Sequence, residues 1–357
     1  MPDQNFSFFK TFWKKLRRNR GAVFGLCIII LAILIAVFAY VLAPDNTPDA
    51  NRIIVEIAAK KPGYKQQFFK LKKDNTSSIG NSFSGKTEAY QYIPITSLLT
   101  KNDSIFLQKY VDEEVSEQQV YPLNGQLASS LIATKTFHLG TDKFGRDILS
   151  RLIIGTRVSL GVGFIAVLIS LTVGIFLGSI AGYFRGRTDD IVMWFVNVVW
   201  SIPTLLLVFA ITLALGKGYW QVFIAVGLTL WVNVARLVRG QVLSIRELNY
   251  IEATKAMGFS GARTIIRHIL PNIMGPVMVI AASNFASAIV IEAGLSFLGL
   301  GVQAPQPSWG LMIKENYNFI ITNNPMLAIA PGIAIMLLVL AFNLLGNGLR
   351  DVLDVRG

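Results

Sequence analysis

The sequence predicts an all-α membrane protein with six transmembrane helices, both termini in the cytoplasm and an extracytoplasmic insert after the first helix. Of the 357 residues, 53% are hydrophobic and only 15% are charged, whereas soluble domains carry about 25% charged residues. The apolar residues gather in six long runs, and a helix needs about 20 such residues to cross the hydrocarbon layer. Two basic segments flank these runs. The predicted spans are residues 22–42, 158–184, 191–216, 218–235, 269–291 and 326–349.

The chain begins with a basic tail, residues 1–21. Its first 20 residues hold six basic side chains against Asp3, with aromatic residues among the cations. Such a segment binds anionic lipid at the inner leaflet, so membrane lipid is a predicted partner. The first span, residues 22–43, is too long for the apolar region of a secretory signal and ends without a good cleavage site. We therefore expect it to remain as an anchor.

We predict that residues 44–150 form an extracytoplasmic insert. Residues 236–268 carry a net charge of +4 and the basic tail carries +5, and six spans place the two segments on the same side. Positive loops stay in the cytoplasm, which puts the insert outside. Within it, residues 52–59 and 91–99 are candidate strands or short helices. The basic residues flank spans as topology requires, so no nucleic-acid partner is predicted.

The remaining residues, 151–357, form a core of five spans. Gly174, Gly178 and Gly182 repeat every four residues, a pattern that lets helix backbones approach closely. Two interpretations are open: packing within the bundle or contact with a second subunit. Pro203 interrupts the third span, and Pro271 and Pro276 open the fifth. Because proline kinks helices, we expect bends at these positions.

We interpret one match to a nucleotide-binding motif as a chance match. The stretch "GNSFSGKT", from Gly80 to Thr87, satisfies the phosphate-loop pattern. A working phosphate loop follows a buried strand and opens a helix, whereas mostly polar residues precede this one, and the topology places it outside. We expect no cofactor on this chain. His138 and His268 fall on opposite sides of the membrane, and no catalytic or metal-binding set is recognisable.

The sequence of the cytoplasmic loop, residues 240–272, predicts a helix, a turn and a second helix. In "EATKAMGFSGARTIIRHILPN", good helix formers come first, and Ala253, Ala256 and Met257 fall on one face. Gly258 can end that helix and turn the chain. The second helix carries Arg263 and leads through Pro271 into the fifth span. The pattern allows two roles, docking into a groove of another protein or resting on the membrane surface.

The same loop resembles the "EAA" loop in membrane subunits of binding-protein-dependent ABC importers. Five positions match at the family spacing, and two depart, with Thr254 replacing an alanine and His268 standing where isoleucine is usual. "HLGTDKFGRDILSRLIIGTRVSL", residues 138–160, and "EAGLSFLGLGVQAPQPSWG", residues 292–310, resemble the dipeptide/oligopeptide/nickel branch. The matching positions are Glu252, Ala253, Gly258, Leu270 and Pro271.

The resemblance implies a permease subunit of the type I ABC importer kind, in the bacterial plasma membrane. It implies that residues 151–357 are a permease core, and that di-/oligopeptides are the cargo. The implied partners are a second homologous permease, two ABC ATPase subunits that hold ATP and Mg, and an extracytoplasmic solute-binding protein. The chain itself would not be an enzyme. Glu252 and Gly258 would shape the coupling helix, and its apolar face would fill the ATPase groove.

Four charged residues are candidates for a translocation path or gate. Glu292 lies near the outer end of the fifth span, where an ionisable residue is a functional candidate; the alternative is a carboxylate that pairs with a neighbour. Asp142, Arg146 and Asp147 precede the second span. They are expected to form a gate, a docking edge for the binding protein, or a structural ion-pair cluster in which Asp147 pairs with Arg151.

Three other functions are weaker interpretations. The same machine could import nickel, but the spans offer no cluster of histidine or cysteine. A gradient-driven secondary transporter predicts central ionisable residues and internal repeats, which the spans lack. A membrane-anchored enzyme or sensor would act through residues 46–135, where no catalytic set is found.

Overall fold

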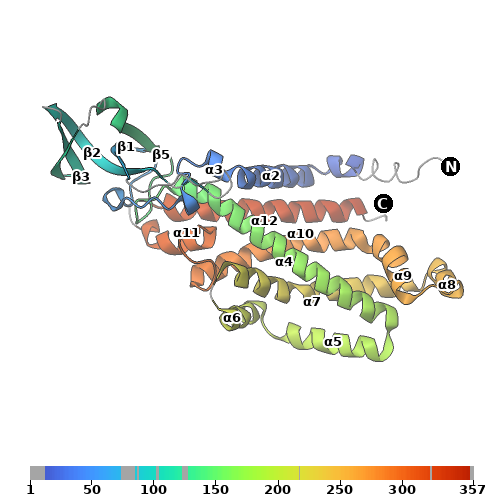
Figure 1. Ribbon diagram of the computed structural model, residues 1–357. Helices are drawn as coiled ribbons and strands as arrows, with labels where there is room; N and C mark the ends of the chain where they lie inside the picture. Colours follow the sequence, from blue (N-terminus) through green and yellow to red (C-terminus); the bar gives the residue numbers. More distant parts are fainter. Residues whose placement is uncertain are drawn as a thin grey trace. The chain divides into compact units, whose positions relative to one another are not determined.

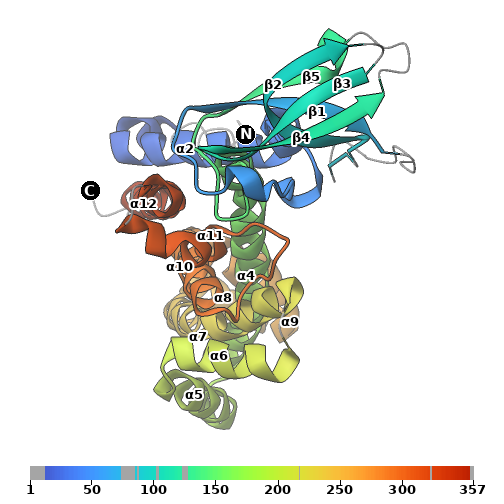
Figure 2. The ribbon, with the colours of Figure 1, turned by 90° about the vertical axis from the view of Figure 1, so that its left-hand side faces the viewer.

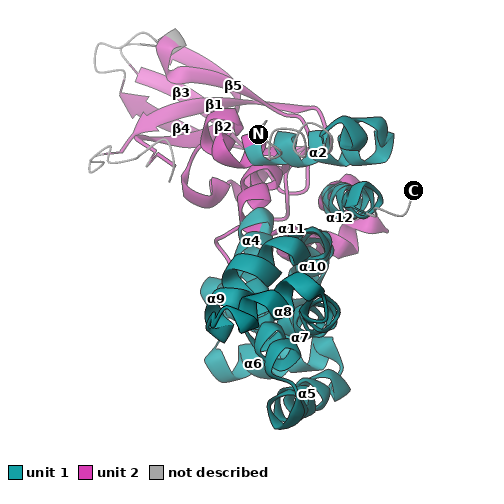
Figure 3. Ribbon diagram, turned by 90° about the vertical axis from the view of Figure 1, so that its right-hand side faces the viewer, with its two compact units in different colours: residues 1–33, 159–303, 334–357 teal, residues 34–158, 304–333 magenta. Residues whose placement is uncertain are grey.

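The computed structural model describes residues 13–73, 85–86, 88–101, 104–122, 128–216, 218–321 and 324–353. The chain forms two compact units, which Figure 3 shows in different colours. Unit 1 comprises residues 1–33, 159–303 and 334–357, and unit 2 comprises residues 34–158 and 304–333.

Unit 2 contains a five-stranded antiparallel sheet, visible in Figure 2. The first four strands follow one another as a meander, and β5 returns beside β1, which gives the order β4-β3-β2-β1-β5. Phe69 of β1 and Ile93 of β2 pack with Ile105 and Leu107 of β3 on one face. The strands are β1 (Tyr64–Lys72), β2 (Tyr90–Lys101), β3 (Ser104–Asp112), β4 (Val115–Pro122) and β5 (Ile132–Phe137).

The sheet corrects the prediction of an all-α protein. Helices still make up most of the chain, but the insert folds as strands, which its aromatic and β-branched residues favour. Of the two candidate segments, residues 91–99 lie within β2. Residues 52–59 hold the short 3₁₀ helix η2 (Val55–Ile57), which is the other form that the sequence allowed. Unit 2 also contains α3 (Ala39–Leu42), the 3₁₀ turns η1 (Pro48–Ala50), η3 (Ala128–Leu131) and η5 (Tyr317–Ile320), and α11 (Trp309–Asn316).

Unit 1 is helical. The helices α2, α4 and α12 each continue from one unit into the other along the chain. Among the described residues, five helical segments are long and apolar enough to cross a membrane, or up to six if the bent pair α5–α6 counts as one span. The helices are α2 (Arg20–Val37), α4 (Ile148–Phe184), α5 (Gly186–Ser201), α6 (Thr204–Leu215), α7 (Tyr219–Arg246), α8 (Asn249–Ala256), α9 (Gly261–Thr264), α10 (Leu270–Leu298) and α12 (Met326–Leu353).

The predicted interruption at Pro203 is confirmed, and it is large. The axes of α5 and α6 differ by 92°. Proline lacks the N–H that continues a helical ladder, and it disfavours a helical conformation in the residue before it. Accordingly, α5 ends at Ser201, and Ile202 is extended with ψ 127°. The third predicted span is therefore two helices.

The fifth span begins earlier than predicted and is continuous from Gly261 to Leu298. The π-helical turn η4 (Ile265–Ile269) lies between α9 and α10, and the Leu270 N–H bonds to the Ile265 carbonyl. A wider turn at this point accommodates Pro271, which donates no hydrogen bond. The short helix and the span that were expected as separate elements are thus one rod.

The glycine repeat packs α4 against α7 within unit 1. A Cβ atom added at Gly174 would lie 2.5 Å from Val234 Cβ, and one added at Gly178 would lie 2.5 Å from the Ala235 carbonyl oxygen. Gly182 meets Val242 in the same way. The repeat therefore serves packing within the bundle, one of the two roles left open by the sequence.

Candidate functional site

The segment between α7 and α10 forms a short helical hairpin. Figure 1 shows α8 and α9 together where α7 ends and the rod containing α10 begins. On α8, Ile251 and Thr254 are buried. The other face, with Ala253 and Ala256, is exposed, and Met257 is 63% exposed. The face that the sequence assigns to docking is therefore the one that is open to a partner.

A glycine turn reverses the chain after α8, as predicted. Gly258 has a φ of +76°, which glycine adopts without the steric penalty of a side chain. Its N–H donates to the Lys255 carbonyl at 2.9 Å, and the Phe259 N–H donates to the Thr254 carbonyl at 3.0 Å. These two bonds form a Schellman motif, which satisfies the last carbonyls of the helix. Gly258 thus sets the direction in which the exposed face is presented.

The buried face of the hairpin is anchored in the bundle. Ile251 packs with Ile265, Ile269 and Ile273 of the rod, and with Tyr183 in the last turn of α4. Burying an isoleucine side chain contributes about 1.5–3 kcal/mol. The buried face of α8, which carries Ile251, therefore holds the exposed apolar face of the same helix in place.

Aromatic and cationic side chains line the turn. The guanidinium of Arg263 lies 4.2 Å from the centre of the Phe259 ring, and that ring stacks on His268 at 5.8 Å. His268, one of the two departures from the family pattern, thus has a packing role. Glu252 and Pro271 are exposed, as is Arg263. All seven residues assigned to the coupling segment lie on the hairpin or in the first turn of α10.

An ionic contact in unit 1 was not foreseen. Arg239 of α7 donates two hydrogen bonds to the carboxylate of Asp189 in α5, at 2.5 and 2.6 Å. Paired bonds of this kind are stronger and more directional than a single one. They fasten the first half of the broken span to α7. A carboxylate in the first turn of α5 was the available signal, but the pairing itself depends on the tertiary fold.

In unit 2, two of the charged candidates form one buried cluster. Arg146 donates to Asp142 through Nε at 2.6 Å and to Glu315 of α11 through Nη2 at 2.7 Å. The expected pairing of Asp147 with Arg151 is wrong. Arg151 faces Asp142 and Glu315 instead, at 4.0 and 3.7 Å. Glu315 was missed, because it lies 169 residues from Arg146 and no local spacing links them.

Asp147 caps the first turn of α4. Its carboxylate accepts the Ser150 N–H at 2.9 Å and also the Ser150 hydroxyl, which is the usual role of aspartate before a helix. Burial raises the pKa of this carboxyl, while the bonds from Ser150 oppose the shift. Asp147 is thus explained by local structure.

Glu292 is fully buried in α10. It accepts a hydrogen bond from the Ser296 hydroxyl at 2.6 Å, and the Ser296 oxygen accepts the Val302 N–H at 3.0 Å. This chain of bonds joins the end of α10 to the segment that follows. The geometry matches the alternative in which the carboxylate pairs with a neighbour.

Comparison with known families decides the identity of the fold. Residues 174–356 match the model of the binding-protein-dependent transport system inner membrane component. The chain belongs to this family. Residues 7–61 also match the N-terminal transmembrane domain of oligopeptide transport permease C. The resemblance inferred from the coupling loop is thereby confirmed.

Individual relatives of this permease are also similar over most of their length. It is 43% identical over 216 residues to the glutathione transport system permease protein GsiD of Pectobacterium atrosepticum, covering 60% of this chain and 71% of that protein. It is 40% identical over 221 residues to the oligopeptide transport system permease protein OppC of Bacillus subtilis, covering 62% and 72%. A chain of the inward-facing MetNI methionine ABC transporter matches with a TM-score of 0.49 and 19% identity, over 57% of this chain and 97% of that one.

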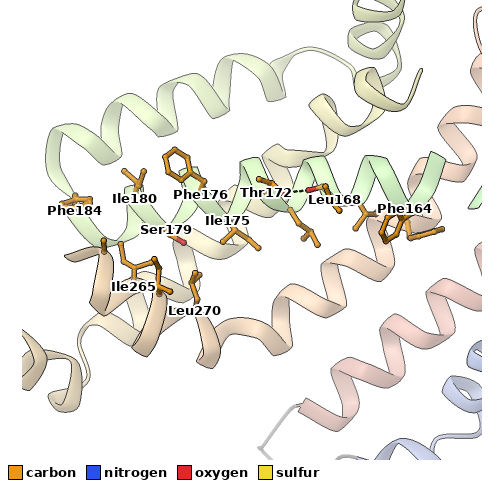
Figure 4. Close-up of a pocket in the computed structure, with 15 residues that line it drawn as sticks. Phe164, Leu168, Thr172, Ile175, Phe176, Ser179, Ile180, Phe184, Ile265 and Leu270 are labelled. Atoms are coloured by element: carbon orange, nitrogen blue, oxygen red, sulfur yellow. Dashed lines mark hydrogen bonds between the residues drawn. The ribbon is translucent and has the colours of Figure 1, made fainter. Parts of the chain in front are cut away.

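The permease also has an apolar groove of about 780 Å³ in unit 1, shown in Figure 4. Its walls are α4 and the start of the rod, including Phe164, Phe176 and Ile265. The Thr172 hydroxyl in this wall donates to the Leu168 carbonyl at 2.8 Å. Among the described residues, none that lines the groove is charged. Such a wall suits hydrocarbon better than it suits a charged peptide.

The phosphate-loop match lies mainly outside the described residues. Of Gly80 to Thr87, the structure describes only Gly85 and Lys86. The Lys86 N–H donates to the Asn46 carbonyl at 2.9 Å. The expectation that this motif binds no nucleotide remains a prediction.

Proposed function

We propose that this permease is one half of the membrane pore of an ATP-driven importer for di- and oligopeptides. The observation that carries the proposal is the exposed face of Ala253, Ala256 and Met257, held outward by a glycine turn and a buried isoleucine. Small apolar side chains on a short helix fit a groove in another protein. Family membership supports the same role, since an inner membrane component of such a system works with separate subunits.

The peptide cargo is supported by the names of three relatives. They are permease proteins of glutathione, oligopeptide and dipeptide transport systems, at 43%, 40% and 44% identity. Glutathione is itself a small peptide, so the three share one chemical class. The binding protein would largely set the choice of cargo.

The proposed topology counts α5 and α6 as one span, which gives six spans and two cytoplasmic termini. The domains follow from it. Residues 1–21 are a cytoplasmic tail, 22–43 the first span, 44–150 an extracytoplasmic insert, and 151–357 the permease core with the coupling loop 240–272. The basic charge of the tail and of residues 236–268 supports this orientation.

The proposed cycle needs a second homologous permease, two ABC ATPase subunits and an extracytoplasmic solute-binding protein. ATP and Mg bind to the ATPase subunits, so this chain is not itself catalytic. Closure of the ATPase dimer pushes on the α8 hairpin. The hairpin packs on Tyr183 of α4 and on Ile269 and Ile273 of the rod, so the push reaches two spans directly.

One purification tests the assignment of partners. The tagged permease, extracted in mild detergent, should retain two ATPase subunits. Met257→Glu places a charge on the docking face and should lower their recovery roughly tenfold, or about 1.4 kcal/mol. Lys255→Gln is the matched control, because Lys255 lies on the opposite side of α8, where its ammonium is 5.8 Å from the Tyr183 ring. Equal recovery with both variants would refute docking through this face.

Uptake tests the cargo separately. Membranes that contain the complete importer should accumulate labelled dipeptides or glutathione in an ATP-dependent manner. Accumulation of nickel without peptide would show that the cargo is nickel, and the proposal of an ATP-driven importer would still hold. Uptake that follows an ion gradient after ATP is depleted would contradict the proposal as a whole.

A further inference from the structure

The buried cluster in unit 2 has an unusual symmetry, because two guanidinium groups face the same two oxygen atoms. Arg146 contacts Asp142 Oδ2 through Nε at 2.6 Å and Glu315 Oε2 through Nη2 at 2.7 Å. Arg151 faces the same Asp142 oxygen through Nε at 4.0 Å and the same Glu315 oxygen through Nη2 at 3.7 Å. The same pair of nitrogen atoms is used in both arginines. Arg146 is hydrogen-bonded to both carboxylates in this structure, and Arg151 lies about 1 Å too far from them to form these bonds.

Arg151 is not satisfied where it stands. Its side chain is fully buried, and within the described residues none of its guanidinium nitrogens has a hydrogen-bond partner. A buried charged group without hydrogen bonds costs free energy. Charge-assisted N–H···O bonds measure about 2.7–2.9 Å, so Arg151 would reach both carboxylates after a shift of roughly 1 Å. Shifts of 1–2 Å are common when packed helices change state.

Arg146 has other partners available if it leaves. Its Nη1 donates to the Asn51 side-chain oxygen at 3.4 Å. Its guanidinium carbon lies 4.6 Å from the centre of the Phe144 ring, within the range of a cation–π contact. Besides Asp142 and Glu315, Arg151 has one further acidic neighbour, Asp49, to which it makes no hydrogen bond among the described residues. Exchange would therefore give Arg151 hydrogen-bond partners, and Arg146 would keep its contacts with Asn51 and Phe144.

We propose that Arg146 and Arg151 exchange on Asp142 and Glu315 during the transport cycle, so that Arg151 is a positioning residue for transport. Arg146 belongs to the segment before α4, and Arg151 belongs to the first turn of α4. Exchange thus moves the anchor of α11 from that segment to the helix. Since α4 also carries Tyr183 in its last turn, the helix that receives α11 also contacts the coupling hairpin. That the exchange accompanies transport rests on the proposed function; that the two arginines share the same two carboxylates does not.

The test is a double-mutant cycle with Arg146→Met and Arg151→Met, each of which keeps an unbranched apolar side chain. Exchange predicts that each single variant folds, because the remaining arginine can hold both carboxylates. The double variant leaves the buried Asp142 and the partly buried Glu315 without either arginine. Its loss of thermal stability should then exceed the sum of the two single losses. This measurement on the purified permease needs no knowledge of cargo or partners.

Uptake by the complete importer gives the second readout. Each single variant is held in one state, so its maximal uptake rate should fall roughly fivefold or more while KM stays unchanged. Arg151→Lys, which keeps the charge, should recover part of the rate. Arg157→Met is the control, because that arginine lies on α4 but packs over the Tyr40 ring at 5.2 Å.

Two results would overturn the exchange. One is wild-type uptake and stability in Arg151→Met, which would leave Arg151 without a role. The other is an Arg146→Met variant as unstable as the double variant, which would describe a static ion pair between Arg146 and the two carboxylates. If the wild-type importer moves no peptide, the proposed cargo fails, and the stability cycle still decides the exchange.

Discussion

The hydroxyl oxygens of Thr254 and Thr264 lie 3.3 Å apart, between α8 and the start of the rod. Both side chains are buried, at 3% and 0% exposure. The Thr254 hydroxyl also lies 2.7 Å from the Ile251 carbonyl, and the Thr264 hydroxyl lies 3.2 Å from the Ser260 carbonyl. Thr254 replaces the second alanine of the family pattern, and this contact gives the replacement a physical role. It ties the two arms of the hairpin together.

We predict a graded response at the buried face of this hairpin. Thr254→Ala removes one shared hydroxyl contact and should weaken the hairpin by about 1 kcal/mol. Ile251→Ala removes a fully buried side chain and should cost about 2–5 kcal/mol. Hydrogen exchange of the α8 amides in the purified permease measures both, with exposed Lys255→Ala as reference. Unchanged exchange in Ile251→Ala would show that the hairpin does not depend on its buried face.

The glycine turn makes a second prediction. Within the described chain, no atom lies within 4 Å of a Cβ added at Gly258, so the space is open and the penalty comes from the backbone alone. A left-handed conformation costs an ordinary residue about 1–2 kcal/mol, and asparagine tolerates it better. Gly258→Asn should retain peptide uptake, whereas Gly258→Val and Gly258→Pro should lose it while the protein stays in the membrane. Equal uptake in the Asn and Pro variants would contradict this role for the turn.

Local patterns predicted the elements that depend on neighbouring residues. The turn at Gly258, the break at Pro203 and the stripe at Gly174 were all found from spacing and residue type. These features depend on the backbone within a few residues. Five of the six predicted spans coincide with long apolar helices among the described residues, and the third is the bent pair α5–α6. The helix α4 begins ten residues before the predicted apolar run, at the position that Asp147 caps.

Ion pairs between residues far apart in the chain could not be predicted from the sequence. Glu315 meets Arg146, and Asp189 meets Arg239, across separations that no spacing rule covers. The sheet was missed for a different reason. Its strands are only six to twelve residues long, and β1 is rich in lysine and glutamine, so the pattern resembles that of a polar loop.

The contact between Asp189 and Arg239 leads to a third prediction. Asp189→Asn removes the carboxylate charge that binds Arg239. Local opening of α5 should then become roughly fivefold more frequent, which corresponds to about 1 kcal/mol. Asp190→Asn is a matched control, since Asp190 is the next residue, is exposed and attracts Arg239 less than Asp189 does. Hydrogen exchange of the α5 amides separates the two variants. Identical exchange in both would mean that the pair does not hold the broken span.

The last prediction concerns the insert and its dependence on pH. The Lys135 ammonium of β5 lies 3.6 Å from the centre of the Tyr92 ring, and Arg52 lies 4.7 Å from the same centre. Burial, and then the nearby Arg52 charge, lower the pKa of Lys135 from 10.5 to about 8. Between about pH 8 and 10.5 the folded insert has released a proton that the unfolded chain still binds. Stability should therefore rise with pH across this window.

Lys135→Met removes this dependence and is the variant to compare. The wild-type permease should gain thermal stability relative to Lys135→Met between pH 8 and 10, by a few kcal/mol at most, since one pKa unit corresponds to about 1.4 kcal/mol. Amine labelling gives an independent measurement, because only the neutral amine reacts. Lys135 should reach its maximal labelling near pH 9, once its rate is corrected for access with an exposed lysine such as Lys65. A stability difference that stays constant from pH 7 to 10 would show that Lys135 keeps its charge beside Tyr92.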